Sequence, residues 1–525
     1  MKKSILLITL AIYGLVFCSC QKTVPETVEE LKPQAISATA GDPVLLASNG
    51  LTIESLNGAI TANEISGFKT YMNSQTVNSY GGNNIWVFGG PSSNVEAFGN
   101  MYEATGDVAI LDRMIYFCDG ILSTRNDKAT AANGGQKATW TGNIDPIWPS
   151  SAKDTVIAQA GIEQGRVLAH MAYCAKLILE HPAIWNTNVG IGDSKGYGAT
   201  YKARALKYIT ECNYVIDNWI IPRFVRTSDK LLYFPGAPNT YMANGPAPWN
   251  QLVMVTDVMI RLVQCHVLLN NEASRITQYD AIVQANINWF IANFTSVTSA
   301  QGSACWRWMY SLTSASLEDC NHFAYDAEGL WMAYNSGRYN IPLLTVTKMA
   351  NTLFDIVLKN QNADGSYAGR VNGTTGINLA AGFFSLKHEY FYLADIRQDK
   401  YFTAANINIS SGDAASTGAT TARILWLKNR RYLAGDGNVE LYQGCDYSGW
   451  KASFGSGNFL LSALVANGGV NDDASAIKVP PGMQAVLYSS DNYGGTAVTF
   501  TADAACLSAS GINDAVSSLK VTTIP

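Results

Sequence analysis

Apolar residues recur every three or four positions through most of the chain between residues 51 and 433, which is the period of a helix with one buried face. Clusters of Gly, Asn and Pro separate these segments. About ten helices are expected, and the clearest lie at 165–180, 199–220, 251–270, 280–294, 322–334, 343–358 and 379–395. Many are apolar over a wide arc, as in helices that are covered on two sides. This pattern favours an α/α toroid at 51–433, in which an inner ring of helices lies inside an outer ring. An α-solenoid is the alternative, although the chain has no repeat of fixed length.

From residue 437 onward the pattern changes to short alternating segments separated by turns. Two motifs occur there twice and in the same order. The segment Tyr442–Gly449 (YQGCDYSG) matches Tyr488–Gly495 (YSSDNYGG), and Val470–Ala476 (VNDDASA) matches Ile512–Ser518 (INDAVSS). We therefore expect a small all-β domain at 437–525 that is built from two similar halves.

The first twenty residues have the pattern of a secretory signal. Lys2 and Lys3 precede an apolar run from Ile5 to Phe17, which is too short for a comfortable membrane span. The small residue before Cys20 resembles a bacterial lipoprotein box. That resemblance implies lipidation of Cys20 and a membrane-anchored protein in the cell envelope of a Gram-negative bacterium. An ordinary signal peptide with an incidental cysteine is the alternative. Residues 21–50 are polar and contain prolines, so they predict a flexible linker.

The composition describes a globular, weakly acidic protein. Hydrophobic residues make up 47% and charged residues 15%, which excludes a disordered chain. The formal net charge of −5 lacks the basic footprint of a nucleic-acid-binding protein, so we expect no nucleic-acid partner. Cysteine spacing gives no CxxC zinc motif, and no organic cofactor is expected. Cys305–Cys320 and Cys445–Cys506 are candidate disulfides. The cysteines expected to be buried thiols are Cys174, Cys212 and Cys265.

The two repeated C-terminal motifs resemble those of βγ-crystallin domains, which are pairs of Greek-key motifs packed as a β-sandwich. In that family the Asn/Asp-Asn/Asp-x-x-Ser/Thr-Ser stretch binds calcium, and its carboxylate, amide and hydroxyl oxygens are the hard ligands that calcium prefers. The resemblance implies metal ligands at Asn471, Asp472, Ser475, Asn513, Asp514 and Ser517. The first motif ends in Ala476 instead of serine, so we expect the second to bind more tightly. A sandwich that has lost its calcium sites is the alternative.

Candidate chemistry in the helical part centres on His322. It lies in the segment Glu318–Asp326 (EDCNHFAYD) at the start of a helix, where Tyr325 and Asp326 share its face. His388 begins a second cluster of aromatic and titratable residues, HEYFY, which includes Tyr390. The other histidines, His170, His181 and His266, are interpreted as structural.

Two further segments add an amide, a cation and a phenol. The sequence Pro246–Gln251 (PAPWNQ) sets Asn250 at the mouth of a helix. The sequence Trp306–Tyr310 (WRWMY) places Arg307 between two indoles, with Tyr310 after it. Aromatic faces with a cation are typical of carbohydrate grooves, because sugars stack on indole rings and arginine can bind a carboxylate.

Together these features resemble toroid-type polysaccharide lyases, such as alginate and glucuronan lyases, over about 55–430. The matching features are Trp249-Asn250, the stretch Glu318–Tyr325 and the helical pattern. The resemblance implies β-elimination on an anionic, uronic-acid-containing polysaccharide. Asn250 and Arg307 would neutralise the carboxylate, His322 would take the C5 proton, and a tyrosine would protonate the leaving oxygen. The candidate acids are Tyr325, Tyr310 and Tyr390, and His388 is a further catalytic candidate.

Two other functions remain open from the residues alone. A toroid glycoside hydrolase needs two carboxyl groups across a cleft, and the available ones are Asp319, Asp326, Glu328 and Glu389. A surface lipoprotein that binds glycans without turnover is the non-enzymatic alternative.

Overall fold

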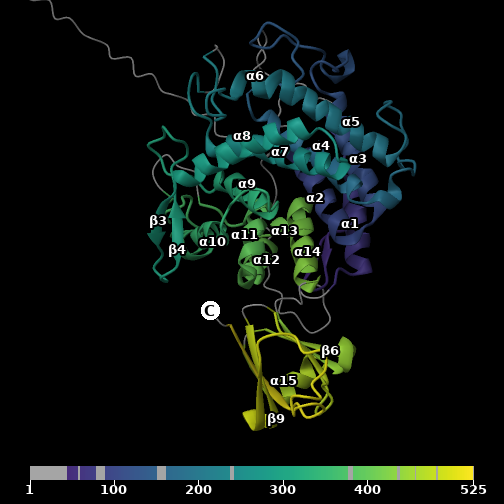
Figure 1. The fold of residues 1–525 in the computed structure, drawn as a ribbon, viewed down its shortest axis with the longest axis vertical. Helices are drawn as coiled ribbons and strands as arrows, with labels where there is room; N and C mark the ends of the chain where they lie inside the picture. The colour runs from purple at the N-terminus through teal and green to yellow at the C-terminus, as the bar shows by residue number, and fades with distance from the viewer. Residues whose placement is uncertain are drawn as a thin grey trace, which may run out of the picture. The chain divides into compact units, whose positions relative to one another are not determined.

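The computed structural model describes residues 44–56, 59–77, 89–149, 161–236, 242–375, 382–433, 438–455, 457–480 and 483–523. The expected signal peptide, Cys20 and most of the expected linker lie outside the described residues. The protein is multidomain: helices dominate as far as Leu433, and strands dominate from Val439 onward (Figure 1).

The helical part follows the periodicity of the sequence closely. Its helices are α1 (Ala62–Ser74), α2 (Gly89–Thr105), α3 (Val108–Ser123), α4 (Gln164–Leu179), α5 (Tyr201–Val215), α6 (Ile221–Phe224), α7 (Trp249–Leu269), α8 (Ala273–Ala292), α9 (Phe323–Asn335), α10 (Leu343–Asn351), α11 (Phe391–Ile396), α12 (Tyr401–Ser410), α13 (Asp413–Ser416) and α14 (Gly418–Leu433). The π-helical turns Ile216–Ile220 and Thr352–Ile356 continue α5 and α10.

Local sequence explains where several helices begin and end. Thr61 and Glu64 form a capping box at the start of α1, because each side chain accepts a hydrogen bond from the backbone N–H of the other residue. Thr200 caps α5 through its side chain. Pro248 precedes α7, and Asn270 ends that helix in the left-handed conformation at φ 51°.

Helix α7 is the longest described helix, and most of its residues are buried. It packs against α4, α8 and α9. By length and composition it is the one described helix that could span a membrane, yet 78% of its most apolar window is buried. Such burial is what the central helix of a globular core requires.

Six helices contact one another in a cyclic order. Helix α2 contacts α4, which contacts α7; α7 contacts α9, α9 contacts α11, α11 contacts α14, and α14 returns to α2. The remaining long helices lie against these six: α1 on α2 and α14, α3 on α2, α5 on α4, α8 on α7, α10 on α9 and α11, and α12 on α11 and α14. Figure 1 shows α4, α7 and α8 lying side by side.

Three local features differ from the sequence-based expectation. The helix expected over 379–395 begins only at the 3₁₀ turn His388–Tyr390, and residues 382–387 are irregular. The strands β3 (Thr295–Thr298) and β4 (Ala304–Arg307) form an antiparallel hairpin that the helical pattern did not predict. The expected linker ends before residue 50, because β1 (Leu45–Leu46) pairs with β2 (Thr52–Ile53) and Asn49 donates to the carbonyl of Ala415 at 3.0 Å.

The C-terminal part contains two antiparallel sheets with the strand orders β6-β5-β8 and β10-β9-β11-β7. Their strands are β5 (Val439–Gly444), β6 (Ser448–Phe454), β7 (Gly457–Phe459), β8 (Ala476–Lys478), β9 (Met483–Ser490), β10 (Gly494–Phe500) and β11 (Ser518–Thr523), with one short helix, α15 (Leu461–Ala466). The inward-facing residues form a separate apolar core, which includes Leu441, Phe454, Leu487 and Leu519. The two repeated motifs of the sequence supply corresponding strands in this arrangement.

Of the two expected disulfides, one forms and the other does not. Cys445 and Cys506 are bonded. Cys305 and Cys320 are free and buried, so their expected pairing is wrong. Cys305 is fixed in β4 opposite Val297, whereas the backbone of Cys320 bonds to Gly369. The buried thiols expected from helical patterns are confirmed at Cys174, Cys212 and Cys265.

Candidate functional sites

His322 and Asp319 form a dyad at the start of α9. The Nδ1 atom of His322 lies 2.9 Å from Oδ2 of Asp319. The other carboxylate oxygen, Oδ1, accepts the backbone N–H groups of Asn321 and His322, each at 2.9 Å. The imidazole is 30% exposed. Because Nδ1 is held by the carboxylate, Nε2 is the ring nitrogen that can exchange a proton with a substrate.

Two buried carboxyl groups lie behind this dyad. Glu318 and Asp326 are both fully buried. Burial and the proximity of the other carboxyl raise the pKa of Glu318 well above its usual value. Burial also raises the pKa of Asp326 to about 7, although Trp308 Nε1 donates a hydrogen bond to it at 2.9 Å. At least one of the two carboxyls is therefore protonated near neutral pH, which leaves Asp319 as the charged partner of His322.

Two of the expected tyrosines lie beside the dyad. The ring of Tyr310 is centred 5.1 Å from the ring of His322. The ring of Tyr325 lies near two cations, with Arg166 Cζ at 5.4 Å and Lys387 Nζ at 5.1 Å from its centroid. Both tyrosines are half-buried, so each retains a solvent-facing edge. The structure thus places Tyr310 against the ring of His322, and Tyr325 three residues further along the chain, where its backbone N–H donates to the carbonyl of His322 at 2.9 Å.

Other expected site residues lie elsewhere or are enclosed. Arg307 is exposed on β4, while its neighbours Trp306 and Trp308 pack toward the helical core, so the expected guanidinium between two indoles does not form. Tyr390 is 1% exposed, and its hydroxyl donates to the carbonyl of Cys320. Burial raises the pKa of Tyr390 well above its usual value. These contacts give Tyr390 a packing role.

Asn250 and His388 face inward from helix starts. Asn250 occupies the second position of α7, is 4% exposed, and its Oδ1 has no hydrogen-bond partner in the described chain. The side chain of His388 lies beside Glu389, with Nε2 3.3 Å from Oε1. Burial lowers the pKa of His388, although the adjacent Glu389 opposes this shift.

A buried charge cluster, which the sequence analysis did not identify, lies among the six cyclically contacting helices. Its members are Glu96, Arg166, His170, Asp257, Arg261, Glu328, Glu389 and Arg423. The sequence signal that could have found it is the placement of charged residues at helical spacing on otherwise apolar helices, as with Asp257 and Arg261 on α7.

Ion pairs tie this charge cluster together. Arg166 bonds Glu328 and lies 3.5 Å from Glu389, and Arg261 lies 2.8 Å from Glu96. Arg423 stacks on Tyr392, with Cζ 3.7 Å from the ring centroid. Several polar atoms of the cluster have no hydrogen-bond partner in the described chain; they include all three guanidinium nitrogens of Arg423, Oε1 of Glu328 and Oδ1 of Asp257.

The carboxyl groups of the charge cluster differ in protonation. Burial opposes the ionisation of Glu389, but His388, Lys387 and Arg166 outweigh it and lower the pKa of Glu389 to about 2. Burial raises the pKa of Glu328 despite its contact with Arg166. Burial and the nearby Glu328 raise the pKa of Asp257 well above its usual value. Carboxyl groups with raised pKa values thus lie close to one with a lowered pKa value, an arrangement that is common at functional sites.

The helices around this cluster run in a common direction. Beyond Glu96 and His170, Asn100 of α2 donates to the hydroxyl of Tyr173 of α4 at 3.2 Å. Farther along, Trp426 of α14 donates to Glu103 of α2 at 2.8 Å, and its ring meets Trp331 of α9. Along α7, Arg261 and then Cys265 donate to the carbonyls of Ala169 and Ala172 of α4, so these two helices also run in the same direction. The N-terminal ends of α4, α7 and α9, with their positive dipole ends, therefore share the side that carries His322 and Asn250.

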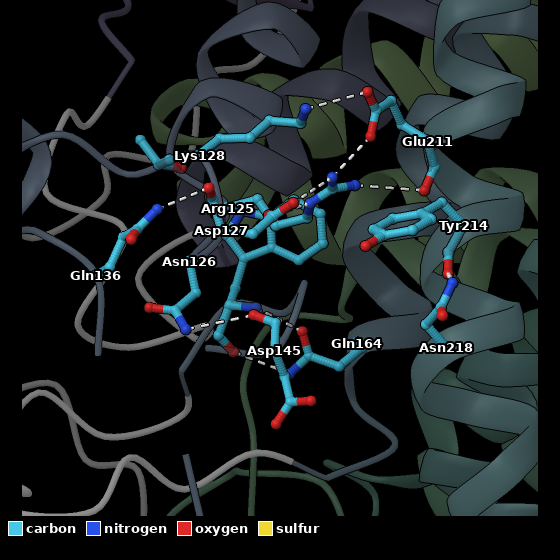
Figure 2. Close-up of polar contacts among 12 residues, drawn as sticks. Arg125, Asn126, Asp127, Lys128, Gln136, Asp145, Gln164, Glu211, Tyr214 and Asn218 are labelled. Carbon is cyan, nitrogen blue, oxygen red and sulfur yellow. Dashed lines mark hydrogen bonds and ion pairs between the residues drawn. The ribbon is translucent and has the colours of Figure 1, made fainter. Parts of the chain in front are cut away.

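A polar network links residues 125–148 to the start of α4 and to α5 (Figure 2). Arg125, whose side chain is 1% exposed, lies 2.6 Å from Asp127 and 2.7 Å from Glu211 of α5. Gln164 exchanges hydrogen bonds of 2.8 and 2.9 Å with the backbone of Trp148. Because Gln164 is the first residue of α4, these contacts fix the helix start two residues before Arg166.

The candidate metal ligands of the C-terminal part form two equivalent clusters, and each cluster uses both repeated motifs. Ser475 of the first motif donates to Oδ1 of Asp514 in the second, at 2.6 Å. Ser517 of the second motif donates to Oδ1 of Asp472 in the first, at 3.1 Å. The two aspartates adopt left-handed backbone conformations, with φ 55° at Asp472 and 51° at Asp514. Oxygen atoms from both halves are thereby gathered at each position, as calcium requires.

The asparagines and the final serine have supporting places. Asn471 and Asn513 each donate to the aspartate that follows, at 2.8 and 2.7 Å. The hydroxyl of Ser518 donates to the carbonyl of Ser490 at 2.8 Å and accepts from the N–H of Tyr493 at 3.1 Å. Ser518 therefore fastens a hairpin and does not enter either ligand cluster. Alanine at position 476 removes no oxygen from the ligand cluster of the first motif.

Comparison with known proteins identifies this C-terminal part as a βγ-crystallin-like domain. It is 33% identical over 88 residues to Development-specific protein S of Myxococcus xanthus and 32% identical to a homolog of that protein from the same organism. These matches cover 17% of this chain, and the chain spans about half the length of the curated relatives it matches.

Solved structures similar to this segment include a βγ-crystallin domain from Flavobacterium johnsoniae and the N-terminal domain of protein S. They are 35% and 33% identical, cover 16% and 17% of this chain and 93% and 98% of their own, and each has a TM-score of 0.16. No family model matches the chain.

Proposed function

We propose that the helical part is an α/α toroid and a carbon–oxygen lyase that cleaves a uronic-acid-containing polysaccharide, of the alginate or glucuronan type, by β-elimination. The cyclic contacts of α2, α4, α7, α9, α11 and α14 support the toroid. The observation that carries the lyase function is the His322–Asp319 dyad, with Tyr310 and Tyr325 next to it.

In this mechanism Nε2 of His322 takes the proton from C5 of the uronate. Asp319 holds the Nδ1 proton and stabilises the imidazolium that forms. The electrons of the broken C5–H bond form a C4–C5 double bond, and the C4–O4 bond breaks. A tyrosine protonates the departing O4, and Tyr310 is the better placed because its ring lies beside His322. The product carries an unsaturated sugar at its new end.

An anionic substrate needs local positive charge, because the chain as a whole has a formal charge of −5. Lys387 lies 5.1 Å from the ring of Tyr325, and the N-terminal ends of three helices face the same side. The amide oxygen of Asn250 has no hydrogen-bond partner among the described residues, which supports Asn250 as the amide that binds the substrate. These groups replace Arg307 as the expected neutralisers of the uronate charge.

The decisive experiment is to incubate the purified protein with uronate polymers and to follow the ultraviolet absorbance of unsaturated ends. His322→Ala should retain the wild-type melting temperature and lose nearly all turnover. His181→Ala, at the exposed end of α4, is the matched control and should retain activity. Wild-type protein that releases no unsaturated product from any uronate polymer would refute the lyase function.

A glycoside hydrolase is the second candidate function, and one observation favours it. Arg166 contacts both Glu328 and Glu389, whose pKa values move in opposite directions, as an acid and a base require. A hydrolase would release saturated sugars, and Glu328→Gln would abolish turnover while His322→Ala would not. A glycan-binding protein without catalysis would show affinity but no products.

For the βγ-crystallin-like domain we propose calcium binding at both ligand clusters. Each cluster offers a carboxylate, a hydroxyl and nearby loop carbonyls, which are ligands of the kind that calcium prefers. Calcium at a hundredfold excess over its dissociation constant should stabilise the domain by about 2.7 kcal/mol. An unchanged melting temperature of the domain in calcium, compared with chelator, would contradict this proposal.

We also propose that Cys20 carries a lipid and tethers the mature protein to the cell envelope of a Gram-negative bacterium. The apolar run that ends in a small residue before Cys20 supports this placement. Cys20→Ala should abolish metabolic lipid labelling and membrane fractionation. A variant that remains lipid-labelled would rule out this anchor.

A further inference from the structure

The two halves of the βγ-crystallin-like domain are nearly equivalent in their hairpins. Hairpin A (Tyr442–Gly449) and hairpin B (Tyr488–Gly495) each contain two consecutive left-handed residues and a pair of tyrosine rings, 5.4 Å apart in A and 5.7 Å apart in B. A lysine covers each tyrosine pair, Lys478 in one half and Lys520 in the other. Differences between two such similar structures are therefore informative.

Hairpin B is fastened by two polar side chains. Ser518 binds the backbone at both sides of the turn, through Ser490 and Tyr493. Asp491 accepts the backbone N–H of Leu461, in the other half of the domain, at 2.8 Å. The bonds of Ser518 close the hairpin, and the bond to Asp491 attaches the hairpin to the opposite half.

Hairpin A lacks the counterparts of the Ser518 and Asp491 hydrogen bonds. The residue that corresponds to Ser518 is Ala476, which has no hydroxyl, and the residue that corresponds to Asp491 is Cys445. Cys445 is instead bonded covalently to Cys506 of the opposite half. The backbone N–H of Asp446, also in hairpin A, donates to the carbonyl of Ala505 of that half at 2.7 Å. Trp450 donates to Asp473 and so holds a strand of hairpin A, and the hydroxyl of Ser448 donates to the carbonyl of Cys445 within the turn at 2.9 Å. Neither bond attaches hairpin A to the opposite half, which the disulfide does.

The disulfide lies directly against a candidate calcium ligand. Cys445 Sγ is 3.9 Å from the carbonyl oxygen of Ser475. The backbone of Ser475 is held on one side by Tyr442, where hairpin A begins, at 2.8 Å, and on the other by Leu507, next to Cys506, at 2.7 Å. The disulfide thus joins the two segments that position Ser475, whose hydroxyl meets Asp514.

We propose that the Cys445–Cys506 disulfide positions the Ser475–Asp514 cluster for calcium, and that its reduction weakens this cluster while sparing the Ser517–Asp472 cluster. The reductant is a dithiol: two electrons and two protons convert the disulfide into two thiols, and the dithiol becomes a cyclic disulfide. This inference rests on the calcium binding proposed above. It makes calcium affinity at one of two sites dependent on the thiol redox state.

The experiment is a calorimetric calcium titration of the full chain before and after treatment with a dithiol. The oxidised protein should show two sites, and reduction should weaken one of them at least tenfold. Asp514→Ala and Asp472→Ala identify the sites, because each removes the side-chain oxygens of one aspartate: reduction should still weaken the site that remains in Asp472→Ala and should not alter the one that remains in Asp514→Ala.

Two further variants test the cause. The double variant Cys445→Ser/Cys506→Ser should reproduce the effect of reduction, and adding Ala476→Ser should restore affinity by supplying the missing hydroxyl. Ser518→Ala is the mirror-image control and should weaken the Ser517–Asp472 cluster instead. Equal affinities in the oxidised and reduced protein, or equal weakening of both sites, would overturn the inference while calcium binding stands. Oxidised protein that binds no calcium would overturn both.

Discussion

Replacing Asp319 with asparagine tests the proposed base, because the change alters one contact of the His322 ring. The Oδ1 atom of asparagine can still accept the N–H groups of Asn321 and His322, which now lie 2.9 Å from Oδ1 of Asp319. Its amide nitrogen then occupies the position of Oδ2, 2.9 Å from Nδ1 of the imidazole. That nitrogen is a donor, so Nδ1 must become the acceptor, and the ring proton moves to Nε2.

An imidazole with its proton on Nε2 cannot take the C5 proton at that atom. The corresponding substitution in a histidine–aspartate pair of a hydrolase lowers turnover about 10⁴-fold, which is about 5 kcal/mol in activation free energy. The loss of stability should be smaller, about 1–2 kcal/mol for one hydrogen bond to a charged group. We therefore expect Asp319→Asn to lose at least 10³-fold in turnover with a small change in melting temperature.

The assay is the initial rate of unsaturated product formation at saturating uronate polymer, with thermal unfolding measured on the same samples. Nitrogen NMR of the imidazole reports the tautomer directly and separates a positional effect from loss of structure. If Asp319→Asn kept more than a tenth of the wild-type turnover with the Nε2–H tautomer present, His322 would not be the base.

Three further outcomes follow from buried charges and from the disulfide. Folding raises the pKa of Asp326 to about 7, so the folded state binds its proton more tightly than the unfolded state does. The free energy of unfolding should therefore fall as pH rises from about 4 to about 7. Asp326→Asn, which can keep the bond from Trp308, should flatten this pH dependence in thermal unfolding. Arg166→Gln should lower the free energy of unfolding by about 3–5 kcal/mol, because it leaves Glu328 and Glu389 without their shared cation, whereas Arg307→Gln on the exposed face should change it by less than about 0.5 kcal/mol. Reduction of Cys445–Cys506, which closes a loop of 61 residues, should destabilise the βγ-crystallin-like domain by about 4 kcal/mol in urea titrations; equal denaturation midpoints for both redox states would contradict this.

Sequence periodicity predicted the long helices because each buries a continuous apolar stripe over several turns. The helices expected at 165–180, 251–270 and 322–334 correspond to α4, α7 and α9. The hairpin β3–β4 was missed because its strands are four residues long, so its alternation is too short to stand out. Residues 382–387 were assigned to a helix because they are apolar, although they cover the core without regular structure.

The local part of the candidate site could be predicted, whereas its long-range part could not. The place of His322 at a helix start and its neighbour Tyr325 follow from spacing within one short segment. The ion pair of Arg166 with Glu389 joins residues 223 positions apart, and no spacing rule predicts such a contact. A sequence shows that a helix has a polar position on its buried face, but the partner depends on which helices become neighbours.

The repeated C-terminal motifs show the same division in a smaller structure. Each motif has the composition of a complete calcium site, which makes the two sites look independent along the sequence. The structure instead pairs Ser475 with Asp514 and Ser517 with Asp472, so each ligand cluster belongs to both motifs. Substitution of the aspartate in one motif must then act on the site that carries the serine of the other. Ala476 does not represent a lost calcium ligand. Ser518, at the corresponding position of the second motif, fastens a hairpin and binds no ligand cluster, and in the first half the Cys445–Cys506 disulfide holds the neighbouring turn. Affinity differences between the two sites should therefore follow how each hairpin is fastened, because the oxygen atoms available to calcium are matched.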